Sequence, residues 1–376
     1  MEEKMEERRA GRNTDEEMRE HECMAWMCSI PGLFRPHHLK LLERFGHAAD
    51  LYAAAETETE AMVKEGYAWA GQVRKFRKKH SAEEVSRRLA GQGIRFCYAG
   101  DEEFPEKLRQ IPDPPLGLFI KGTFPDATRP CVGIVGARLC TRHGKETAEA
   151  VARTVAASGG QVISGGAYGI DGAAQMEALR SGGSSFAFLG CGVDLVYPEE
   201  HRNLFEKMYS SGGVISEYHP GAFARPFLFP PRNRLISGLS DVIVIVEARK
   251  KSGSLITAAY AAEQGRDVYA VPGRPEDELS EGCNELISQG AGIFLSPERF
   301  AEDVLSAIGG RKREQTAQLL DSGERKVYGI LGKTSVNIAE IAQRTGLNLS
   351  ELGKILIDLE LKGLIREASA DSYLRI

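Results

Sequence analysis

From about residue 130, short apolar stretches of strand length alternate with longer segments whose apolar residues recur at helical spacing. The apolar stretches are Cys131–Val135, Gln161–Ser164, Ser185–Leu189, Val214–Ser216, Val242–Val246 and Val268–Val271, and helices are expected to begin near Lys145, Ile170 and Glu200. Short strands without polar alternation are typical of a parallel sheet buried on both faces. Because parallel crossovers are right-handed, the alternation predicts a Rossmann-like, doubly wound α/β domain. The pattern leaves the order of the strands open.

The chain before this pattern predicts a small helical module. Its apolar positions include Trp26, Ile30 and Phe45, and a break at Pro31-Gly32 separates two short helices. Such a loop resembles the hairpin of helix-hairpin-helix or SAM-like bundles, whose backbone N–H groups can meet phosphates. We expect a module that only packs, with a second DNA contact as the alternative.

The chain after this pattern predicts three helices and a short β wing, which together resemble a winged helix. The expected recognition helix, Leu349–Lys362, contains three acidic residues besides two lysines. Such a helix would repel the DNA backbone that it must approach. We therefore expect a protein-contact or regulatory module, with duplex binding as the alternative.

These patterns divide the chain into five segments. They are a disordered tail over 1–20, a helical module with a basic linker over 21–94, the α/β domain over 95–308, a linker over 309–323, and the winged helix over 324–376. The tail is assigned from its density of Glu and Arg without an apolar stripe, and a frayed, solvated helix is the alternative.

Composition narrows the class of partner and the compartment. The net charge is −5, so any nucleic-acid site must be a local concentration of basic residues. The chain has seven cysteines, an odd number without CxxC spacing, which favours buried thiols in a reducing compartment. No apolar run approaches the roughly 20 residues of a membrane span, and the charged N-terminus does not resemble a signal peptide. A cytoplasmic protein is expected.

Glycine turns follow three successive predicted strands. They lie at Gly136, at Gly165-Gly166 and at Gly190-Cys191-Gly192. Ligands of doubly wound folds bind beyond the carboxyl ends of the strands, and glycine lets backbone N–H groups approach an anion. The three turns therefore predict a phosphate-binding rim, and tight turns that bind nothing are the alternative.

The usual nucleotide motifs are absent from these turns. Gly144-Lys145 is followed by Glu146, where a P-loop needs Ser or Thr, and Gly133-Ile134-Val135-Gly136 lacks the second glycine of a dinucleotide fingerprint. ATP and NAD are thus disfavoured, and we expect no cofactor. The sequence also lacks a metal-ligand cluster, a catalytic triad and paired carboxylates, so no catalytic or metal-binding residue is assigned.

Basic side chains near the rim favour a ligand with several phosphates over a single nucleotide. Arg138 follows the first glycine turn, Arg202 opens the helix after the third, and Arg232 and Arg234 precede the strand at 242. Arginines spaced in this way suit several successive phosphates. Phe205 lies one helical turn after Arg202 and could stack on a base, or it could pack in the core.

At these residues the sequence resembles the DNA-processing protein A family (DprA, also called Smf). The matching motifs are Val132–Arg138, Ser164–Asp171, Leu189–Pro198, Phe229–Ser240, Ser252–Ala258, Val271–Gly273 and Gly282–Ile287. The resemblance is strongest over residues 95–300. At Ala137, Gln175 and His201 the sequence departs from the residues usual in the family, without loss of a charge.

The resemblance implies a non-catalytic protein that binds single-stranded DNA, protects incoming strands in natural transformation, loads the recombinase RecA and acts as a homodimer. It implies that Arg138 and Arg202 grip phosphates and that Phe205 contacts bases. The rim glycines Gly136, Gly165 and Gly166 would lie against the DNA, the last two offering backbone N–H groups. Ile287 and Ile293 match the segment that the family uses for self-association, and an ordinary core position is their alternative.

Two other functions remain open from the sequence. One is a Rossmann-type nucleotide phosphoribohydrolase, although the segment Ser252–Thr257 lacks the catalytic Glu of that motif. The other is a regulator that binds duplex DNA through the winged helix.

Overall fold

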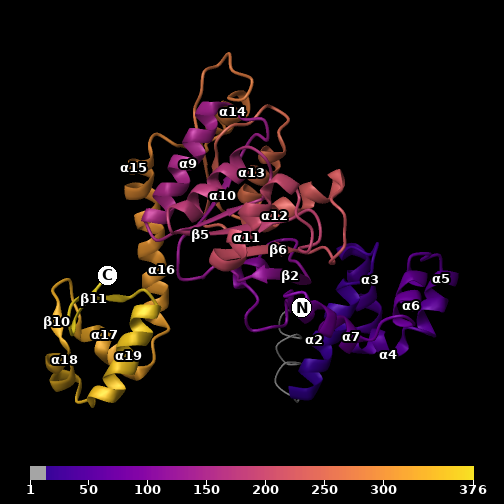
Figure 1. Cartoon of the computed structure of the whole chain (residues 1–376), viewed down its shortest axis with the longest axis horizontal. Helices are drawn as coiled ribbons and strands as arrows, with labels where there is room; N and C mark the ends of the chain where they lie inside the picture. The colour runs from indigo at the N-terminus through magenta and orange to yellow at the C-terminus, as the bar shows by residue number, and fades with distance from the viewer. Residues whose placement is uncertain (1–13) are drawn as a thin grey trace. The chain divides into compact units, whose positions relative to one another are not determined.

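The computed structural model describes residues 14–376, which form two compact units (Figure 1). The first unit runs to Pro125 and resumes over Cys131–Pro297, and the second comprises Asp126–Pro130 and Glu298–Ile376. Most of the predicted disordered tail lies outside the described residues. Its last part, from residue 14 to 20, is helical, because the buried Glu20 carboxylate accepts hydrogen bonds from the N–H groups of Ala48 and Ala49, both at 2.9 Å.

The predicted N-terminal module is a cluster of helices. They are α2 (Thr14–Cys28), α3 (Arg35–Phe45), α4 (Ala48–Ala54), α5 (Glu58–Lys64), α6 (Ala70–Arg77) and α7 (Ala82–Gly91). Trp26, Leu41 and Leu51 are fully buried at its centre. The indole Nε1 of Trp26 donates to the carbonyl of His80 at 3.0 Å, which fastens α2 to the chain after α6.

The basic stretch predicted as a linker is instead part of this module. Helix α6 buries Val73 and Phe76, three residues apart, while Lys75, Lys78 and Lys79 face solvent. Residues at this spacing share one helical face. The run of positive charge is therefore the outer surface of a packed helix, and the prediction of a solvated linker was wrong.

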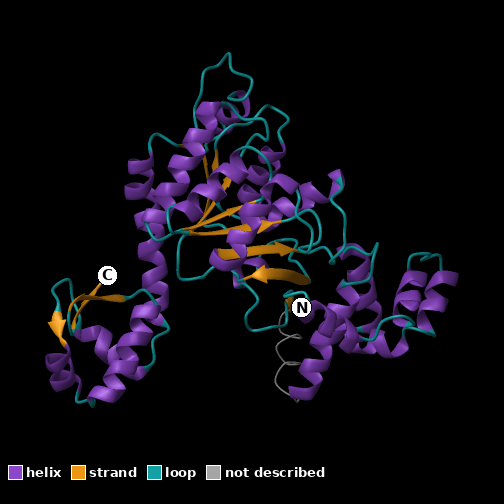
Figure 2. Cartoon of the chain, viewed as in Figure 1, coloured by secondary structure: helices purple, strands orange, loops and turns teal. Residues whose placement is uncertain are grey.

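The predicted Rossmann-like sheet is confirmed. The described residues contain a nine-stranded sheet in the order β1-β2-β6-β5-β4-β3-β7-β8-β9 (Figure 2). The strands are β1 (Arg95–Tyr98), β2 (Gly117–Gly122), β3 (Cys131–Val135), β4 (Gln161–Ser164), β5 (Ser184–Phe188), β6 (Gly212–Ser216), β7 (Val242–Ile245), β8 (Asp267–Ala270) and β9 (Gly292–Ile293). β3 to β9 run parallel to one another, whereas β2 pairs antiparallel with β6 and β1 pairs antiparallel with β2 at one edge.

Helices cover both faces of this sheet. α9 (Arg142–Ala157), α10 (Ile170–Arg180) and α11 (Arg202–Ser211) follow β3, β4 and β5 and pack side by side. α12 (Phe229–Leu239) leads back to β7 and packs against α13 (Gly253–Glu263), with α8 (Glu106–Arg109) beside it. α14 (Glu281–Ser288) and the 3-10 turns η1 (Glu199–His201) and η2 (Pro226–Leu228) complete the domain.

The strand order creates a topological switch between β3 and β7. From β3 the chain builds outward through β4 and β5 to β6, and from β7 it builds in the other direction to β9. The carboxyl ends of the parallel strands meet along one edge, where doubly wound folds bind ligands. All the glycine turns singled out in the sequence lie on this edge, which we call the carboxyl edge.

The second unit contains the predicted winged helix. Its elements are α15 (Pro297–Phe300), a π-helical turn η3 (Ala301–Leu305), α16 (Ser306–Gln318), α17 (Ser322–Ile330), α18 (Ile338–Thr345) and α19 (Leu349–Leu361), with strands β10 (Val336–Asn337), β11 (Ile365–Ser369) and β12 (Ser372–Arg375). Three helices followed by a wing confirm that prediction. The expected linker over 309–323 is largely helical, because α16 buries Ile308 and Lys312 within this unit.

Candidate nucleic-acid interface

The two arginines predicted to grip phosphates are both exposed at the carboxyl edge. Arg138 follows β3, and its guanidinium carbon lies 5.1 Å from the centroid of the Phe229 ring. The Arg202 side chain is 59% exposed at the start of α11 and is 3.4 Å from the carboxylate of Glu199. An exposed pair of this kind is weak and can exchange for a phosphate. Both side chains can therefore meet an anion from solvent.

The glycine turn after β4 does not offer the free backbone amides that the sequence suggested. The N–H of Gly165 donates to Oδ2 of Asp171, and the N–H of Gly166 donates to Oε1 of Gln175, both at 3.1 Å. Both glycines are buried. The prediction that these two amides face phosphate was therefore wrong, because side chains of α10 already satisfy them.

Packing explains why glycine occupies these turns. A Cβ on Gly136 would lie 2.7 Å from Cγ1 of Ile170, and one on Gly165 would lie 2.7 Å from the Arg232 guanidinium. Gly166 adopts a φ of +66°, in the left-handed region that favours glycine. Two residues that depart from the family pattern both contact Gly166. Gln175 accepts a hydrogen bond from the Gly166 N–H, and Nδ1 of His201 lies 3.0 Å from the Gly166 carbonyl oxygen.

Arg232 and Arg234 are buried, contrary to the prediction that they contact DNA. Arg232 is 4% exposed and donates from Nη1 to the carbonyl oxygens of Gly165, at 2.7 Å, and Phe188. Arg234 is 3% exposed and makes a two-bond ion pair with Glu217, at 2.7 and 2.8 Å. Both arginines therefore join elements of the core instead of facing solvent.

Burial controls the ionisation near Arg232. It lowers the pKa of Arg232 to about 10, partly offset by the charge of Asp171. Burial raises the pKa of Asp171 above its usual value, although the positive charge of Arg232 opposes this shift. The pair holds the carboxyl ends of β4 and β5 in place, because Asp171 bonds the Gly165 N–H while Arg232 bonds the Gly165 carbonyl oxygen.

Phe205 lies in the core, so the predicted stacking on a base does not fit the structure. Its side chain is fully buried, together with Leu204 and Met208 on the inner face of α11. A Cβ on Gly166 would lie 3.3 Å from the Phe205 ring. Of the two alternatives left open by the sequence, only the core position is compatible with this placement.

Other aromatic side chains, which sequence reasoning missed, are exposed in the loops of the carboxyl edge. Tyr168 follows β4, Tyr197 follows β5, and Phe223 and Phe227 follow β6, with exposures of 42%, 46%, 73% and 55%. These residues stand in loops or, for Phe227, in the short 3-10 turn η2, without apolar periodicity, so no pattern distinguished them. The only signal was their position in the segments that follow the strand ends.

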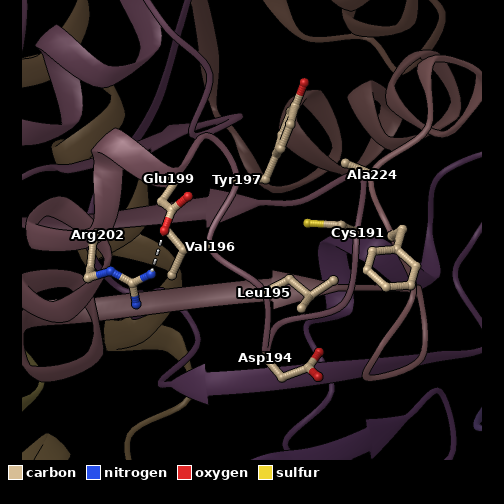
Figure 3. Close-up of a pocket in the computed structure, with 9 residues that line it drawn as sticks. Cys191, Asp194, Leu195, Val196, Tyr197, Glu199, Arg202 and Ala224 are labelled. Carbon is tan, nitrogen blue, oxygen red and sulfur yellow. Dashed lines mark hydrogen bonds and ion pairs between the residues drawn. The ribbon is translucent and has the colours of Figure 1, made fainter.

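The loops after β5 and β6 enclose a cavity of about 350 Å³ (Figure 3). Its lining residues are Cys191, Asp194, Leu195, Val196, Tyr197, Glu199, Arg202, Phe223 and Ala224. Asp194 and Tyr197 lie at opposite ends of the labelled residues, with Leu195 and Val196 between them (Figure 3). The cavity thus combines an aromatic wall, a carboxylate and the exposed Arg202.

The crevice at the topological switch holds a carboxylate of the protein itself. Glu247, which is 8% exposed, accepts hydrogen bonds from the N–H and the hydroxyl of Thr141, the N-cap of α9. A helix N-terminus attracts anions, and in dinucleotide-binding folds this position faces the pyrophosphate. Here Glu247 occupies the position. Residues 14–376 contain no group of three or more His, Cys, Asp or Glu side chains placed to bind a metal ion.

The two residues assigned to self-association lie at the far edge of the sheet. Ile293 is 46% exposed in β9, an edge strand that pairs only with β8 among the described residues. Ile287 on α14 is half-buried against the core. No helix within the described part of the chain is both long and apolar enough to cross a bilayer.

Fold and edge together define a class: a Rossmann-like protein with a winged-helix domain and exposed arginines and aromatics at the carboxyl ends of its strands. Residues 95–305 match the family model of DNA recombination-mediator protein A, and residues 311–370 match that of the DprA winged helix domain. The chain therefore belongs to the DNA recombination-mediator protein A family, also called DprA or Smf.

Two relatives illustrate the similarity. The chain is 38% identical to protein Smf of Synechocystis over 64% of its own length and 61% of the length of that protein. It is 41% identical to the DNA processing protein DprA of Streptococcus pneumoniae, over 55% of this chain and 71% of that protein. The alignment thus spans about three fifths of the Synechocystis relative.

Two solved structures share the fold. DprA of Streptococcus pneumoniae superposes with a TM-score of 0.63 at 33% identity, covering 76% of this chain and 97% of that chain. DprA of Helicobacter pylori, described for its single-stranded DNA binding mode, superposes with a TM-score of 0.52 at 28% identity, covering 57% of this chain and 98% of that chain.

Proposed function

We propose that this chain is a non-catalytic DNA-processing protein that binds single-stranded DNA along its carboxyl edge. The observation that carries the proposal is the presence of both exposed arginines and exposed aromatic rings on this edge, namely Arg138 and Arg202 with Tyr197 and Phe223. An unpaired strand presents phosphates, which arginines bind, and unstacked bases, which aromatic rings can stack on. The single-strand binding described for the Helicobacter pylori relative supports the same assignment.

The role of the edge is tested by charge reversal at Arg138 and Arg202. The double variant R138E/R202E should lose at least about 30-fold in affinity for a mixed-sequence single-stranded oligonucleotide, because two attractive charges become repulsive. The matched control is R153E/R180E, which changes the net charge equally on α9 and α10, away from the first turns of these helices. Fluorescence anisotropy at low salt measures both.

The outcome separates a local site from general electrostatics. Near-normal binding by the control with loss in R138E/R202E supports the carboxyl edge. Equal losses in both double variants would mean that only net charge matters, and normal binding by R138E/R202E would exclude the edge. The wild type should also show a salt dependence, with log K falling by about 0.7 per neutralised phosphate for each tenfold rise in salt.

We further propose, from family membership, a homodimer formed through β9 and a role in loading RecA. The exposed Ile293 and Leu295, the latter 65% exposed, support the first. I293E should shift the dimer to a monomer in light scattering. For the second, the wild type should accelerate RecA assembly on single strands coated with a single-strand-binding protein, and R138E/R202E should not. A cytoplasmic location remains a prediction.

One structural feature argues against each of the two alternative functions, the nucleotide phosphoribohydrolase and the duplex-binding regulator. A bound nucleotide phosphate at the N-terminus of α9 would compete with the Glu247 carboxylate. Release of free base from a nucleoside monophosphate would nevertheless support the enzyme. For duplex binding, α19 exposes Leu349, Ile357 and Leu361 beside its acidic residues, which favours a protein contact. Preference for duplex over single strands would support the regulator.

A further inference from the structure

A row of aromatic rings crosses from the carboxyl edge onto the N-terminal helical module. Neighbouring ring centroids are 6.1, 6.3, 4.9 and 5.9 Å apart along this aromatic row, which consists of Phe227, Phe34, His37, Trp69 and Tyr67 in that order. We propose that the aromatic row continues the path of single-stranded DNA beyond the carboxyl edge and stacks on bases of the same strand. This inference rests on the proposed binding of single-stranded DNA at that edge. It locates, on side chains, the DNA contact of the module that the sequence left open as an alternative.

The aromatic row begins where the module meets the α/β domain. Phe34, just before α3, packs its ring against Phe227 in η2 and against Tyr218 after β6, the latter at 6.2 Å between centroids. Next to it, Nε of Arg35 donates to the carbonyl oxygen of Pro114 at 2.7 Å. The first ring of the module is therefore held against the loop after β6, which belongs to the carboxyl edge.

Hydrogen bonding and packing order the rest of the row. The backbone N–H of Phe34 donates to Nδ1 of His37 at 3.0 Å, which fixes the imidazole in the first turn of α3. The His37 ring packs on Trp69, the N-cap residue of α6, and Trp69 packs on Tyr67. Because these rings are already held by their neighbours, stacking on a base costs little additional side-chain entropy.

All five rings of the aromatic row are accessible to solvent. Phe227 is 55% exposed, and the other four are half-buried. Rings that served only to hold the module together would gain more from complete burial, as Trp26 does in the core of the module. An unpaired base can stack on an accessible ring, and each such contact contributes about 1–3 kcal/mol. A row of accessible rings therefore suits an unpaired strand, whereas a duplex keeps its bases stacked on each other.

Exposed basic side chains stand at both ends of the aromatic row. Arg225 lies two residues before Phe227 and is exposed, without an ion-pair partner among residues 14–376. Lys40 on α3 is 48% exposed and lies close enough to Tyr67 for the two side chains to interact electrostatically. Its ion pair with Glu43, at 2.8 Å, is exposed and can yield to a phosphate. Phosphates of a strand stacked on the row can therefore meet a cation at either end, which favours a polyanion as the partner.

Tryptophan fluorescence reports the proposed contact directly. The chain has two tryptophans, and Trp26 is fully buried, so a base can stack only on Trp69. Saturating the full chain with 20-residue oligo-dT should quench the emission by at least about one fifth, because a stacked base quenches the indole. The variant W69F leaves only Trp26 as an emitter and should abolish the quenching.

Two charge reversals within the module provide a second measurement. K40E places a carboxylate beside the aromatic row, and the matched control K78E makes the same change at an exposed position at the far end of α6 from Trp69. Affinities for 20-residue and 6-residue oligo-dT are measured by fluorescence anisotropy. K40E should weaken binding of the longer strand at least about threefold and that of the shorter strand less, because the carboxyl edge alone can hold a short strand. K78E should bind both strands like the wild type.

The outcomes distinguish this inference from the proposed function. Quenching that W69F abolishes, together with a loss of affinity in K40E that K78E does not share, supports the aromatic row. A bound 20-residue strand that leaves the emission unchanged, or a loss in K40E no larger than in K78E, overturns the row while single-strand binding stands. Failure of the wild type to bind the 20-residue strand overturns the proposed function itself.

Discussion

The hydroxyl and the backbone N–H of Thr141 both donate to the carboxylate of Glu247, at 2.6 and 2.9 Å. Thr141 caps α9, and Glu247 comes from the loop after β7 on the other side of the topological switch. The two halves of the doubly wound domain are thus joined at the point where related folds bind a nucleotide. A carboxylate of the protein therefore occupies the position that a ligand phosphate takes in those folds.

Replacing Glu247 by alanine should destabilise the protein by about 1–3 kcal/mol. The variant E247A leaves the two partly buried donors of Thr141 at the start of α9 without their acceptor, and it opens a space beside Gly144, whose hydrogens now face the carboxylate. Urea unfolding measures the change. E247Q is the control, since its amide oxygen still accepts, and it should lose clearly less. Equal stability of E247A and E247Q would contradict this account.

Arg232 should contribute to stability as a donor and as a charge. R232M removes the partner of the Gly165 and Phe188 carbonyl oxygens and should lower the free energy of unfolding by about 2–4 kcal/mol. Because Asp171 is then left without the nearby positive charge, the double variant D171N/R232M should be more stable than the sum of the single losses predicts. A double-mutant cycle by urea unfolding checks this. Strict additivity would mean that the two residues act independently.

Phe205 and Phe223 should show opposite effects on stability and binding. F205A empties a fully buried position and should cost about 3–5 kcal/mol in unfolding free energy, whereas F223A removes an exposed ring and should change it by less than about 0.5 kcal/mol. F205L, which keeps most of the volume, serves as the control. Thermal and urea unfolding measure both. Unchanged stability of F205A together with weaker DNA binding would restore the base-stacking role.

His21 should make a pH-dependent contribution to stability. A hydrogen bond to Asp101, with Nε2 and Oδ2 3.3 Å apart, raises the pKa of His21 above 6.5, and the Phe96 carbonyl oxygen at 3.2 Å adds to the shift against the effect of burial. A raised folded-state pKa means that the contribution is complete below about pH 6.5 and is lost as pH rises through the folded value.

The measurement is the difference in unfolding free energy between the wild type and H21Q at pH 5.5 and at pH 8.5. The difference should be larger at pH 5.5, by up to about 1 kcal/mol, as for a partly exposed ion pair. D101N should remove most of this pH dependence. An equal or larger difference at pH 8.5 would show that the hydrogen bond to Asp101 does not favour the protonated imidazole.

Local patterns accounted for much of the fold. The strands at 131 and 161 and the helix from Ile170 begin where the sequence predicts, because apolar runs and glycine turns are short-range signals. The basic stretch before residue 80 was misassigned because charge is visible in a sequence, whereas the inward placement of Val73 and Phe76 depends on the helices that cover them.

The candidate site was predicted in its location but only partly in its residues. Arg138 and Arg232 are both arginines beside the carboxyl edge, yet one is exposed and the other is buried. The difference lies in partners far along the chain. Arg232 donates a hydrogen bond to the buried Phe188 carbonyl oxygen, whereas Arg138 lies over the ring of Phe229 at the surface. Sequence spacing cannot reveal such partners.

The sequence by itself determined that this protein has a doubly wound domain between two helical flanks and that its ligand edge carries glycine turns and arginines. These features follow from periodicity and residue type, which are local. Only the tertiary structure decided the strand order, the burial of Phe205 and Arg234, the exposure of Tyr197 and Phe223, and the occupation of the switch point by Glu247. Burial and hydrogen bonding are set by residues distant in sequence, so they are decided when the elements pack together.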